Sequence, residues 1–291
     1  MFKNNNVCIL SFDIEDWFQV ENLKQAIKKE EWEGQKLRVV ENTRKLLSIL
    51  NNYGITATFF VLGWIAEKVP QLIYHIHKLG HEIASHGYEH ELIHNLSQEE
   101  FRNDLIKSKR ILEGITGQKI LGYRAPSFSI TDWTIDMLKE IGYVYDSSYF
   151  PTSFHNRYGK LNSKASIKRC TKNGLFQYSN GLIEVPMPTL NLLSISIPWG
   201  GGAYFRLMPY PIFKQGIKTI LNKNKLFTFY FHSWEIDNDQ PRIKNIKLNY
   251  KLRHYTGLKN SYMKLERFLK DFSFTSIRDY LKRMDLLPVK Y

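Results

Sequence analysis

The sequence predicts an α/β fold built on a parallel β-sheet, because short apolar runs alternate with helical patterns through the first half of the chain. Polar side chains that could carry out chemistry follow the ends of the expected strands, which is where parallel barrels and open α/β sheets build their sites. The sequence contains no internal repeat, low-complexity tract or clear linker, so we expect a single domain over residues 1–291.

The expected strands are short buried runs, and the expected helices carry apolar residues at helical spacing. Strands are expected at 7–12, 57–62, 81–85, 120–125 and 227–231, and helices at about 40–50, 66–79, 97–114 and 131–141. Gly54, Gly80 and Gly142 stand where three of the helices should end, and Ser97 with Glu100 forms a capping box at the start of another. Loops and short strands are expected at 143–210, and a helix pair at about 258–287.

The composition narrows the class of protein. Of the 291 residues, 43% are hydrophobic and 24% are charged, which fits a globular protein and not a disordered one. The two cysteines, Cys8 and Cys170, exclude a disulfide scaffold and a four-cysteine zinc site. The net charge of +13 suggests an anionic partner or a nearby membrane surface, and no nucleic-acid-binding motif accompanies it.

The lengths of the apolar runs bear on where in the cell the protein is located. None approaches the roughly 18 consecutive apolar residues of a transmembrane helix, and the apolar patch at 7–12 is too short for a signal peptide. We therefore expect a cytoplasmic protein, with peripheral association with the inner membrane left open. Basic residues gather at 214–225 and 242–253, where they could attract an anionic glycan, a lipid-diphosphate carrier or acidic lipids, or form only a solvated face.

Two clusters of titratable residues follow expected strands. Asp13, Glu15 and Asp16 repel one another unless a cation or an arginine neutralises them, although a solvated acidic turn is an equal alternative. His86 and His90 are four residues apart and can converge on one metal ion if the backbone turns helically. Two imidazoles and one carboxylate, with an open position left over, are a common catalytic zinc set.

His232 follows the last expected strand and could act as an acid catalyst, with Glu184 orienting its imidazole. The alternative is a structural histidine. Residues 90–94, His-Glu-Leu-Ile-His, also match the H-E-x-x-H pattern of zinc metalloproteases. That pattern belongs inside a long helix, whereas the capping box at Ser97 starts a new helix immediately afterwards, so we disfavour this reading.

Taken in order, these clusters resemble the polysaccharide deacetylases of the NodB-homology type, a class of carbohydrate esterase. The similarity is greatest to the exopolysaccharide-associated subgroup found with bacterial exosortase systems. The matching stretches are SFDIEDWFQV at 11–20, SHGYEH at 85–90, GYRAPSFS at 122–129, YDSS at 145–148 and FHSWEID at 231–237, with further subgroup markers GGGAYFR at 200–206 and RHYTG at 253–257.

The resemblance implies a distorted (β/α) barrel, often of seven strands. It also implies a hydrolase that depends on a divalent metal, usually zinc, and removes N-acetyl groups from hexosamine units of a bacterial surface polysaccharide or its lipid-linked precursor. Core motifs are expected in 7–150 and 180–237, followed by a subgroup-specific extension at about 238–291.

Carried over by position, the resemblance implies that Asp13 is the general base and that Arg124 keeps its carboxylate ionised. It implies that His232 is the general acid, and Glu184 lies in the region of the carboxylate that orients it.

The resemblance further implies that His86 and His90 are metal ligands. The acidic ligand is either Glu15 or Asp16, because the family often has two adjacent aspartates at this point and this chain does not. Strand geometry places Glu15 on the same face as the base, Asp13, which favours Glu15.

Substrate contacts are expected from residues of the matching stretches that flank the site: Trp17, Tyr88, Pro126, Ser127 and Trp234. An aromatic content of 14% suits stacking on sugars, although the same rings could pack the core. Ser127 stands where many relatives have glycine. A non-catalytic glycan-binding relative and another linear amide as substrate stay open, and the sequence does not identify the sugar or the oligomeric state.

Overall fold

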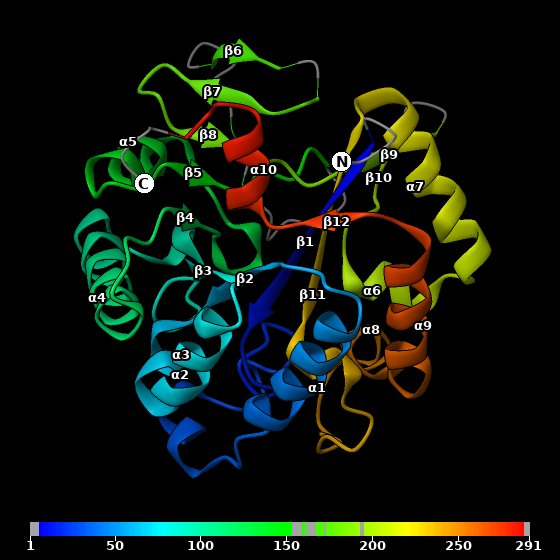
Figure 1. Cartoon of the computed structure of the whole chain (residues 1–291). Helices are drawn as coiled ribbons and strands as arrows, with labels where there is room; N and C mark the ends of the chain where they lie inside the picture. The colour runs from blue at the N-terminus through cyan, green and yellow to red at the C-terminus, as the bar shows by residue number, and fades with distance from the viewer. Residues whose placement is uncertain are drawn as a thin grey trace.

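The computed structural model describes residues 6–152, 159, 161, 167–171, 173–192 and 195–287. A parallel sheet lies at its centre (Figure 1), and its seven neighbouring parallel strands are, in sheet order, β11 (Leu226–His232), β1 (Val7–Ile14), β2 (Thr58–Val61), β3 (Glu82–Ser85), β4 (Gly122–Tyr123), β5 (Tyr145–Asp146) and β8 (Ile183–Glu184). Among the described residues no ladder joins β8 to β11, so the barrel is distorted and open at that seam. The predicted α/β barrel is confirmed.

The remaining strands are short. Antiparallel β7 (Phe176–Tyr178) and β6 (Ile167–Cys170) extend the sheet beyond β8, while β9 (Thr189–Leu192) and β10 (Ile195–Pro198) pair separately. Within the described part of 143–210, this agrees with the expected loops and short strands. The expected helix pair at 258–287 differs, because β12 (Phe274–Thr275) interrupts it and pairs with β1.

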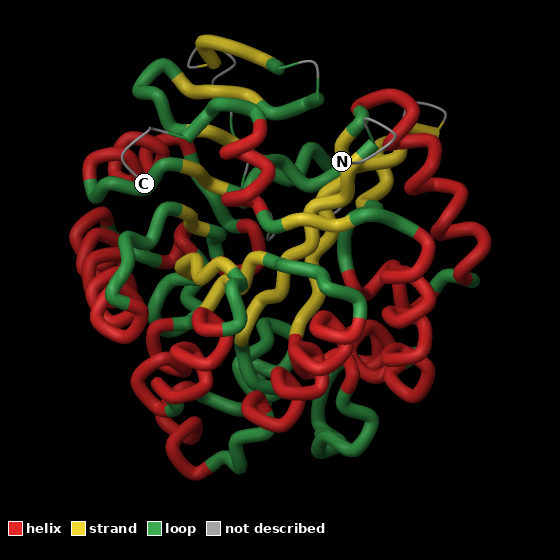
Figure 2. Tube along the Cα trace, in the orientation of Figure 1, coloured by secondary structure: helices red, strands yellow, loops and turns green. Residues whose placement is uncertain are grey.

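Helices surround the strands (Figure 2). They are α1 (Val39–Asn52), α2 (Gly63–Lys68), α3 (Pro70–Lys78), α4 (Gln98–Thr116), α5 (Asp132–Glu140), α6 (Gly202–Leu207), α7 (Tyr210–Asn224), α8 (Leu248–Tyr255), α9 (Leu258–Asp271) and α10 (Ile277–Arg283). Short 3₁₀ helices occur at η1 (Lys29–Gly34), η2 (Ile93–Asn95), η3 (Pro126–Phe128) and η5 (Ser233–Ile236). In the described part of the chain, none of the helices has both the length and the apolar character needed to cross a bilayer.

Two local signals explain where particular helices begin. The capping box at α4 is confirmed, since Ser97 Oγ accepts the backbone N–H of Glu100 and the Glu100 carboxylate accepts that of Ser97. The single helix expected at 66–79 is two helices, because Pro70 lacks an N–H and forces Val69 out of the helical region.

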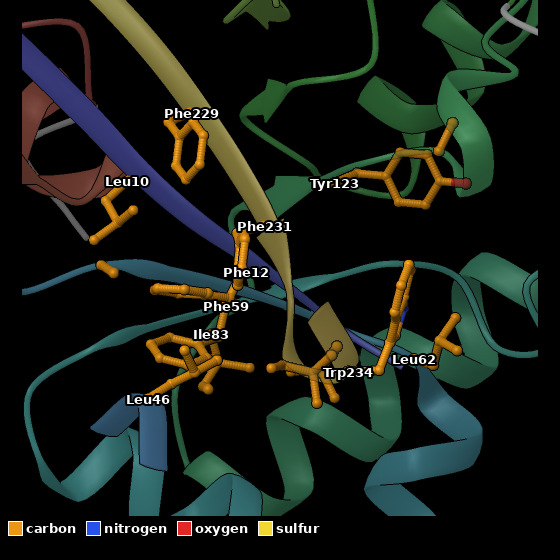
Figure 3. Packing of buried hydrophobic residues seen from close by; sticks show 14 of the residues in the cluster. Leu10, Phe12, Leu46, Phe59, Leu62, Ile83, Tyr123, Phe229, Phe231 and Trp234 are labelled. Carbon is orange, nitrogen blue, oxygen red and sulfur yellow. The ribbon is translucent and has the colours of Figure 1, made fainter. Parts of the chain in front are cut away.

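Buried side chains alternate along β1 between two cores. Leu10 and Phe12 belong to the large core toward the helices, where Phe12 packs 5.1 Å from Phe59, centroid to centroid (Figure 3). Ile9 belongs to a second core that also takes residues from β2, β3, β5, β8 and β11 and from α10, and this core fills the barrel interior. Because side chains alternate along a strand, Asp13 shares the interior face with Ile9 and lies at the strand's carboxyl end. The barrel interior therefore opens onto the polar residues at this edge.

Candidate active site

The carboxyl ends of the strands surround an open pocket of about 610 Å³. Its lining includes Asp13, Glu15, His86, His90, Ser127 and His232. The parallel register explains how distant segments meet here, since β1 and β11 pair from Val7 with Leu226 through to Asp13 with His232.

Three buried side chains in this pocket form a group that could hold a metal ion. One potential ligand atom from each of Glu15, His86 and His90 lies within 4.8 Å of the others. Glu15 Oε2 is buried and accepts no hydrogen bond, although it lies only 3.0 Å from His90 Nε2. The two atoms therefore lie side by side in this group. A buried carboxylate oxygen without a hydrogen bond is costly, and a cation between these groups would satisfy it.

The ring of His86 is oriented for ligation. Its Nδ1 lies 2.8 Å from the backbone oxygen of Arg124, which can only accept, so Nδ1 carries the proton and Nε2 has a free lone pair. Burial lowers the pKa of His86 to about 4, so the imidazole is neutral at neutral pH. For Glu15, burial opposes ionisation, but the charges of His90 and His232 outweigh it and hold the pKa below its ordinary value.

The backbone around these ligands is unusual. His90 has a φ of 55°, Ser127 of 50° and Phe128 of 58°, all in the left-handed region that few residues other than glycine adopt. Such conformations concentrate at functional sites, where the surrounding structure maintains them. Glycine would adopt the conformation of Ser127 without strain.

Asp13 is held by a fully buried arginine. Arg124 Nη1 donates to Asp13 Oδ1 at 2.7 Å and to Ser11 Oγ at 2.9 Å. Its Nε and Nη2 donate to the backbone oxygen and hydroxyl of Ser147, and its guanidinium lies 4.0 Å from the centre of the Phe60 ring. The structure thus brings Arg124 and Asp13 together as expected.

His232 faces this carboxylate group from β11. Its Nε2 lies 3.1 Å from Glu15 Oε1 and 3.9 Å from Asp13 Oδ2. Burial opposes a charge on His232, but the carboxylates of Glu15 and Glu235 outweigh it and raise the pKa to about 9. The imidazole can therefore hold a proton on the side that faces the pocket.

The prediction for Glu184 is wrong. Its carboxyl accepts the Tyr149 backbone N–H at 2.9 Å and the Tyr178 hydroxyl at 3.3 Å, on the far strand β8. The carboxylate that contacts His232 is that of Glu235, whose Oε1 lies 2.5 Å from His232 Nδ1. The spacing His-Ser-Trp-Glu at 232–235 resembles a capping box, and this signal could have identified Glu235.

Asp16 is not a ligand in this arrangement. Its Oδ2 accepts the backbone N–H groups of Arg38 and Val39 at 2.7 and 2.9 Å, and its Oδ1 accepts that of Trp17 at 2.8 Å. The carboxylate therefore caps the start of α1 and lies outside the Glu15, His86 and His90 group. Burial raises the pKa of Asp16 to about 6, while these backbone hydrogen bonds oppose the rise.

The expected substrate-binding residues divide into two sets. Ser127 and Trp234 line the pocket, whereas Trp17, Tyr88 and Pro126 are buried residues outside its described lining. Trp17 packs edge-on against Phe18 in the core, and the Tyr88 hydroxyl donates to Glu67. The rings of Trp17 and Tyr88 therefore pack in the core. This is the alternative to sugar stacking that the sequence analysis considered.

The segment 90–94 does not form the helix that a metalloprotease needs. Ile93–Asn95 is a single 3₁₀ turn, His94 is exposed, and Glu91 pairs with Lys24 at 2.7 Å. His94 lies outside the potential ligand group, so the structure agrees with the preference against a protease.

Comparison with known proteins identifies two family models that together cover most of the chain. Residues 6–145 match the model described as polysaccharide deacetylase. Residues 147–282 match a model described as a domain of unknown function, DUF3473. The Asp13, Glu15, His86, His90 and Arg124 side chains lie in the first segment, and His232 lies in the second.

Curated relatives match up to about half of the chain. A peptidoglycan-N-acetylglucosamine deacetylase of Bacillus cereus is 31% identical over 123 residues, 37% of this chain and 45% of the relative. A peptidoglycan deacetylase of Helicobacter pylori is 27% identical over 149 residues, 49% of this chain and 51% of the relative. The chain thus spans about half the length of these relatives.

Solved structures show the same fold over nearly the whole chain. A Pseudomonas aeruginosa protein described as a probable polysaccharide deacetylase superposes with a TM-score of 0.60 at 14% identity, covering 96% of this chain and 91% of that one. A Mycobacterium smegmatis protein described in similar terms gives a TM-score of 0.56 at 18% identity, covering 99% and 94%.

Proposed function

We propose that this chain, whose residues 6–145 carry a polysaccharide deacetylase domain, is a metal-dependent hydrolase that removes N-acetyl groups from N-acetylhexosamine units. The observation that carries the proposal is the position of Asp13 and His232. Each lies beside the Glu15, His86 and His90 group in one pocket, which supports their assignment as base and acid beside a cation site.

The donor set fits a divalent cation. Glu15, His86 and His90 would hold it, and two imidazoles with one carboxylate suit zinc while tolerating cobalt or nickel. When bound, such an ion polarises a carbonyl oxygen and lowers the pKa of a coordinated water molecule to about 7.

The chain's own residues move the protons. Asp13 accepts a proton from water as the water oxygen adds to the acetyl carbon, and Arg124 holds the Asp13 carboxylate in position by a hydrogen bond. His232 donates the proton on Nε2 to the sugar nitrogen as the carbon–nitrogen bond breaks. The products are acetate and a free amine.

The proposed substrate is a bacterial surface polysaccharide or its lipid-linked precursor, processed with zinc as the resident metal. The named relatives that act on peptidoglycan support a glycan as the class of substrate. Arg253 lines the pocket and the chain carries a net charge of +13, which favours an anionic glycan or a phosphate-bearing carrier. The markers at 200–206 and 253–257 support the exopolysaccharide-associated subgroup.

The test is acetate release from N-acetylglucosamine oligomers, peptidoglycan and lipid-linked N-acetylhexosamine, before and after chelation and after zinc is restored. We expect release that chelation abolishes and zinc recovers. His90→Asn should lose both metal and activity, while His94→Asn, a matched change four residues away, should keep both. A zinc-loaded chain that releases no acetate from any of these glycans, or release that survives chelation, would overturn the proposal.

A further inference from the structure

We infer that the segment 147–282 builds the acid side of the site: Glu235 and Arg206 position His232, and the backbone at 253–256 anchors Arg206. This inference rests on the proposed function and deepens it. It assigns a task to the segment whose family model is described as a domain of unknown function.

A continuous chain of contacts supports the inference. His232 Nδ1 lies 2.5 Å from Glu235 Oε1, and Glu235 Oε2 accepts from Arg206 Nε at 2.7 Å. Arg206 and Glu235 each expose 1% of the side chain, so this is a buried ion pair. A buried pair of this kind contributes little to stability when well-packed apolar residues could replace it, which points to a positional role.

The far end of Arg206 is fixed by the backbone before α9. Its Nη2 donates to the Arg253 carbonyl at 2.9 Å, and its Nη1 donates to the carbonyls of His254, at 3.2 Å, and of Thr256. The rigid guanidinium fork therefore links three backbone oxygens to one carboxylate. Through Glu235, the position of His232 depends on the turn that joins α8 to α9.

Two glycines make room for this arrangement. A Cβ atom at Gly202 would lie 2.3 Å from both carboxylate oxygens of Glu235. Gly257 has a φ of +80°, and a Cβ there would lie 2.9 Å from the Arg206 backbone oxygen. The stretches 200–206 and 253–257, which contain these glycines, are therefore the parts of the chain that support Glu235 and Arg206.

The consequence for His232 concerns which nitrogen delivers the proton. A carboxylate can only accept, so Glu235 holds the Nδ1 proton, and the proton available for transfer sits on Nε2. Nε2 faces Glu15 and the pocket. Trp234 stacks on the other side, with its ring 5.1 Å from that of His232 and 4.4 Å from that of His254, which limits rotation of the imidazole.

The test compares two substrates that differ in their need for an acid. An N-acetylglucosamine trimer releases an amine, which must be protonated, whereas 4-nitrophenyl acetate releases a phenolate, which leaves without a proton. For Glu235→Gln, and for Gly202→Ala, which crowds the carboxylate without removing it, we expect chelator-sensitive amide hydrolysis to fall at least ~30-fold and ester hydrolysis to change by no more than about threefold. Zinc content should be unchanged.

A matched control and a double variant separate positioning from general damage. Glu82→Gln removes another buried carboxylate, at the opposite end of β3 from His86, and should leave both rates near wild type. In a His232→Ala background, Glu235→Gln should cost nothing further, because its partner is gone.

The outcomes are distinguishable from those of the proposed function. Equal loss on both substrates, or a full additional loss in the His232→Ala background, would overturn the positioning role while leaving the deacetylase intact. A zinc-loaded wild type that hydrolyses neither substrate would instead refute the proposed function.

Discussion

Asp13 and His232 are register partners on adjacent parallel strands, and Asp13 Oδ2 lies 3.9 Å from His232 Nε2. Each also forms a hydrogen bond with a different buried partner: Asp13 with Arg124, and His232 with Glu235. The carboxylate of Glu235 favours an imidazole that holds a proton. In the proposed mechanism, the two strands would thus hold the base and the acid side by side without a direct hydrogen bond between them.

The acidic ligand can be identified by comparing Glu15 with its neighbour. We expect Glu15→Gln to weaken zinc binding by more than about 100-fold, since changes to outer contacts alone cost about 10–100-fold. Asp16→Asn should keep the metal but lower the melting temperature, because Asp16 accepts three backbone N–H groups at 2.7–2.9 Å. Competition with a zinc-binding dye and thermal unfolding measure the two effects. Metal loss in Asp16→Asn with retention in Glu15→Gln would reverse the assignment.

The buried pair of Arg124 and Asp13 predicts a coupled loss of stability. Arg124→Met leaves the Asp13 carboxylate buried without its partner, and we expect a cost of about 3–5 kcal/mol in the free energy of unfolding. Adding Asp13→Asn removes the stranded charge and should return at least about 1 kcal/mol of that loss. Urea unfolding of the two single variants and the double variant measures the coupling. Strictly additive losses would show that the pair does not act as a unit.

We expect His81, which lies outside the pocket, to make the stability of the fold depend on pH. Burial, reinforced by the charge of Arg278, lowers the pKa of His81 to about 4, and its Nδ1 accepts the Ala57 N–H at 3.3 Å. The unfolded chain therefore takes up this proton first, so the stabilising contribution is complete above the ordinary pKa of 6.5 and is lost as the pH falls from 6.5 towards 4.

His81→Asn keeps an acceptor at the same place and cannot titrate in this range. Between pH 7 and 4.5 we expect the wild type to lose about 2 kcal/mol more of its unfolding free energy than the variant loses, as measured by urea unfolding. Parallel pH curves for the two proteins would show that His81 is not responsible.

The features of the fold and the site that could be predicted from the sequence are those that depend on local patterns along the chain. The strands β1, β2 and β11 were predictable because each is a buried apolar run, and Asp13 and His232 because they end two of those runs. The group of Glu15, His86 and His90 was predicted as metal ligands, and the structure brings these side chains together.

The wrong assignments of site residues arose where the same type of side chain can serve either the structure or the site. Asp16 and Glu15 are both carboxylates in an acidic cluster, and only the fold shows that α1 begins beside Asp16. Glu184 and Glu235 were both available to orient His232, and the local turn 233–236 selects the nearer one. Trp17 and Tyr88 lie within the motifs but pack in the core, which their spacing in the sequence did not reveal.

The end of α7 predicts a simple stabilising substitution. Lys225 has a φ of 59° directly after the helix, and its N–H donates to the Leu221 carbonyl at 2.8 Å. Helix α4 ends in the same way, but with a glycine, Gly117, at a φ of 68°. A side chain in this left-handed position costs about 1 kcal/mol that glycine avoids, so we expect Lys225→Gly to raise the unfolding free energy by roughly 0.5–1 kcal/mol.

The control for this substitution is Lys225→Ala, which removes the charge and the long side chain but keeps Cβ. Because the penalty comes from Cβ in the left-handed conformation, alanine should give little or none of the gain. Lys225 is exposed and lies at the opposite end of β11 from His232, so zinc content and acetate release should not change in either variant. A gain of equal size in Lys225→Ala would trace the effect to surface charge, and no gain in Lys225→Gly would show that the helix end rearranges instead.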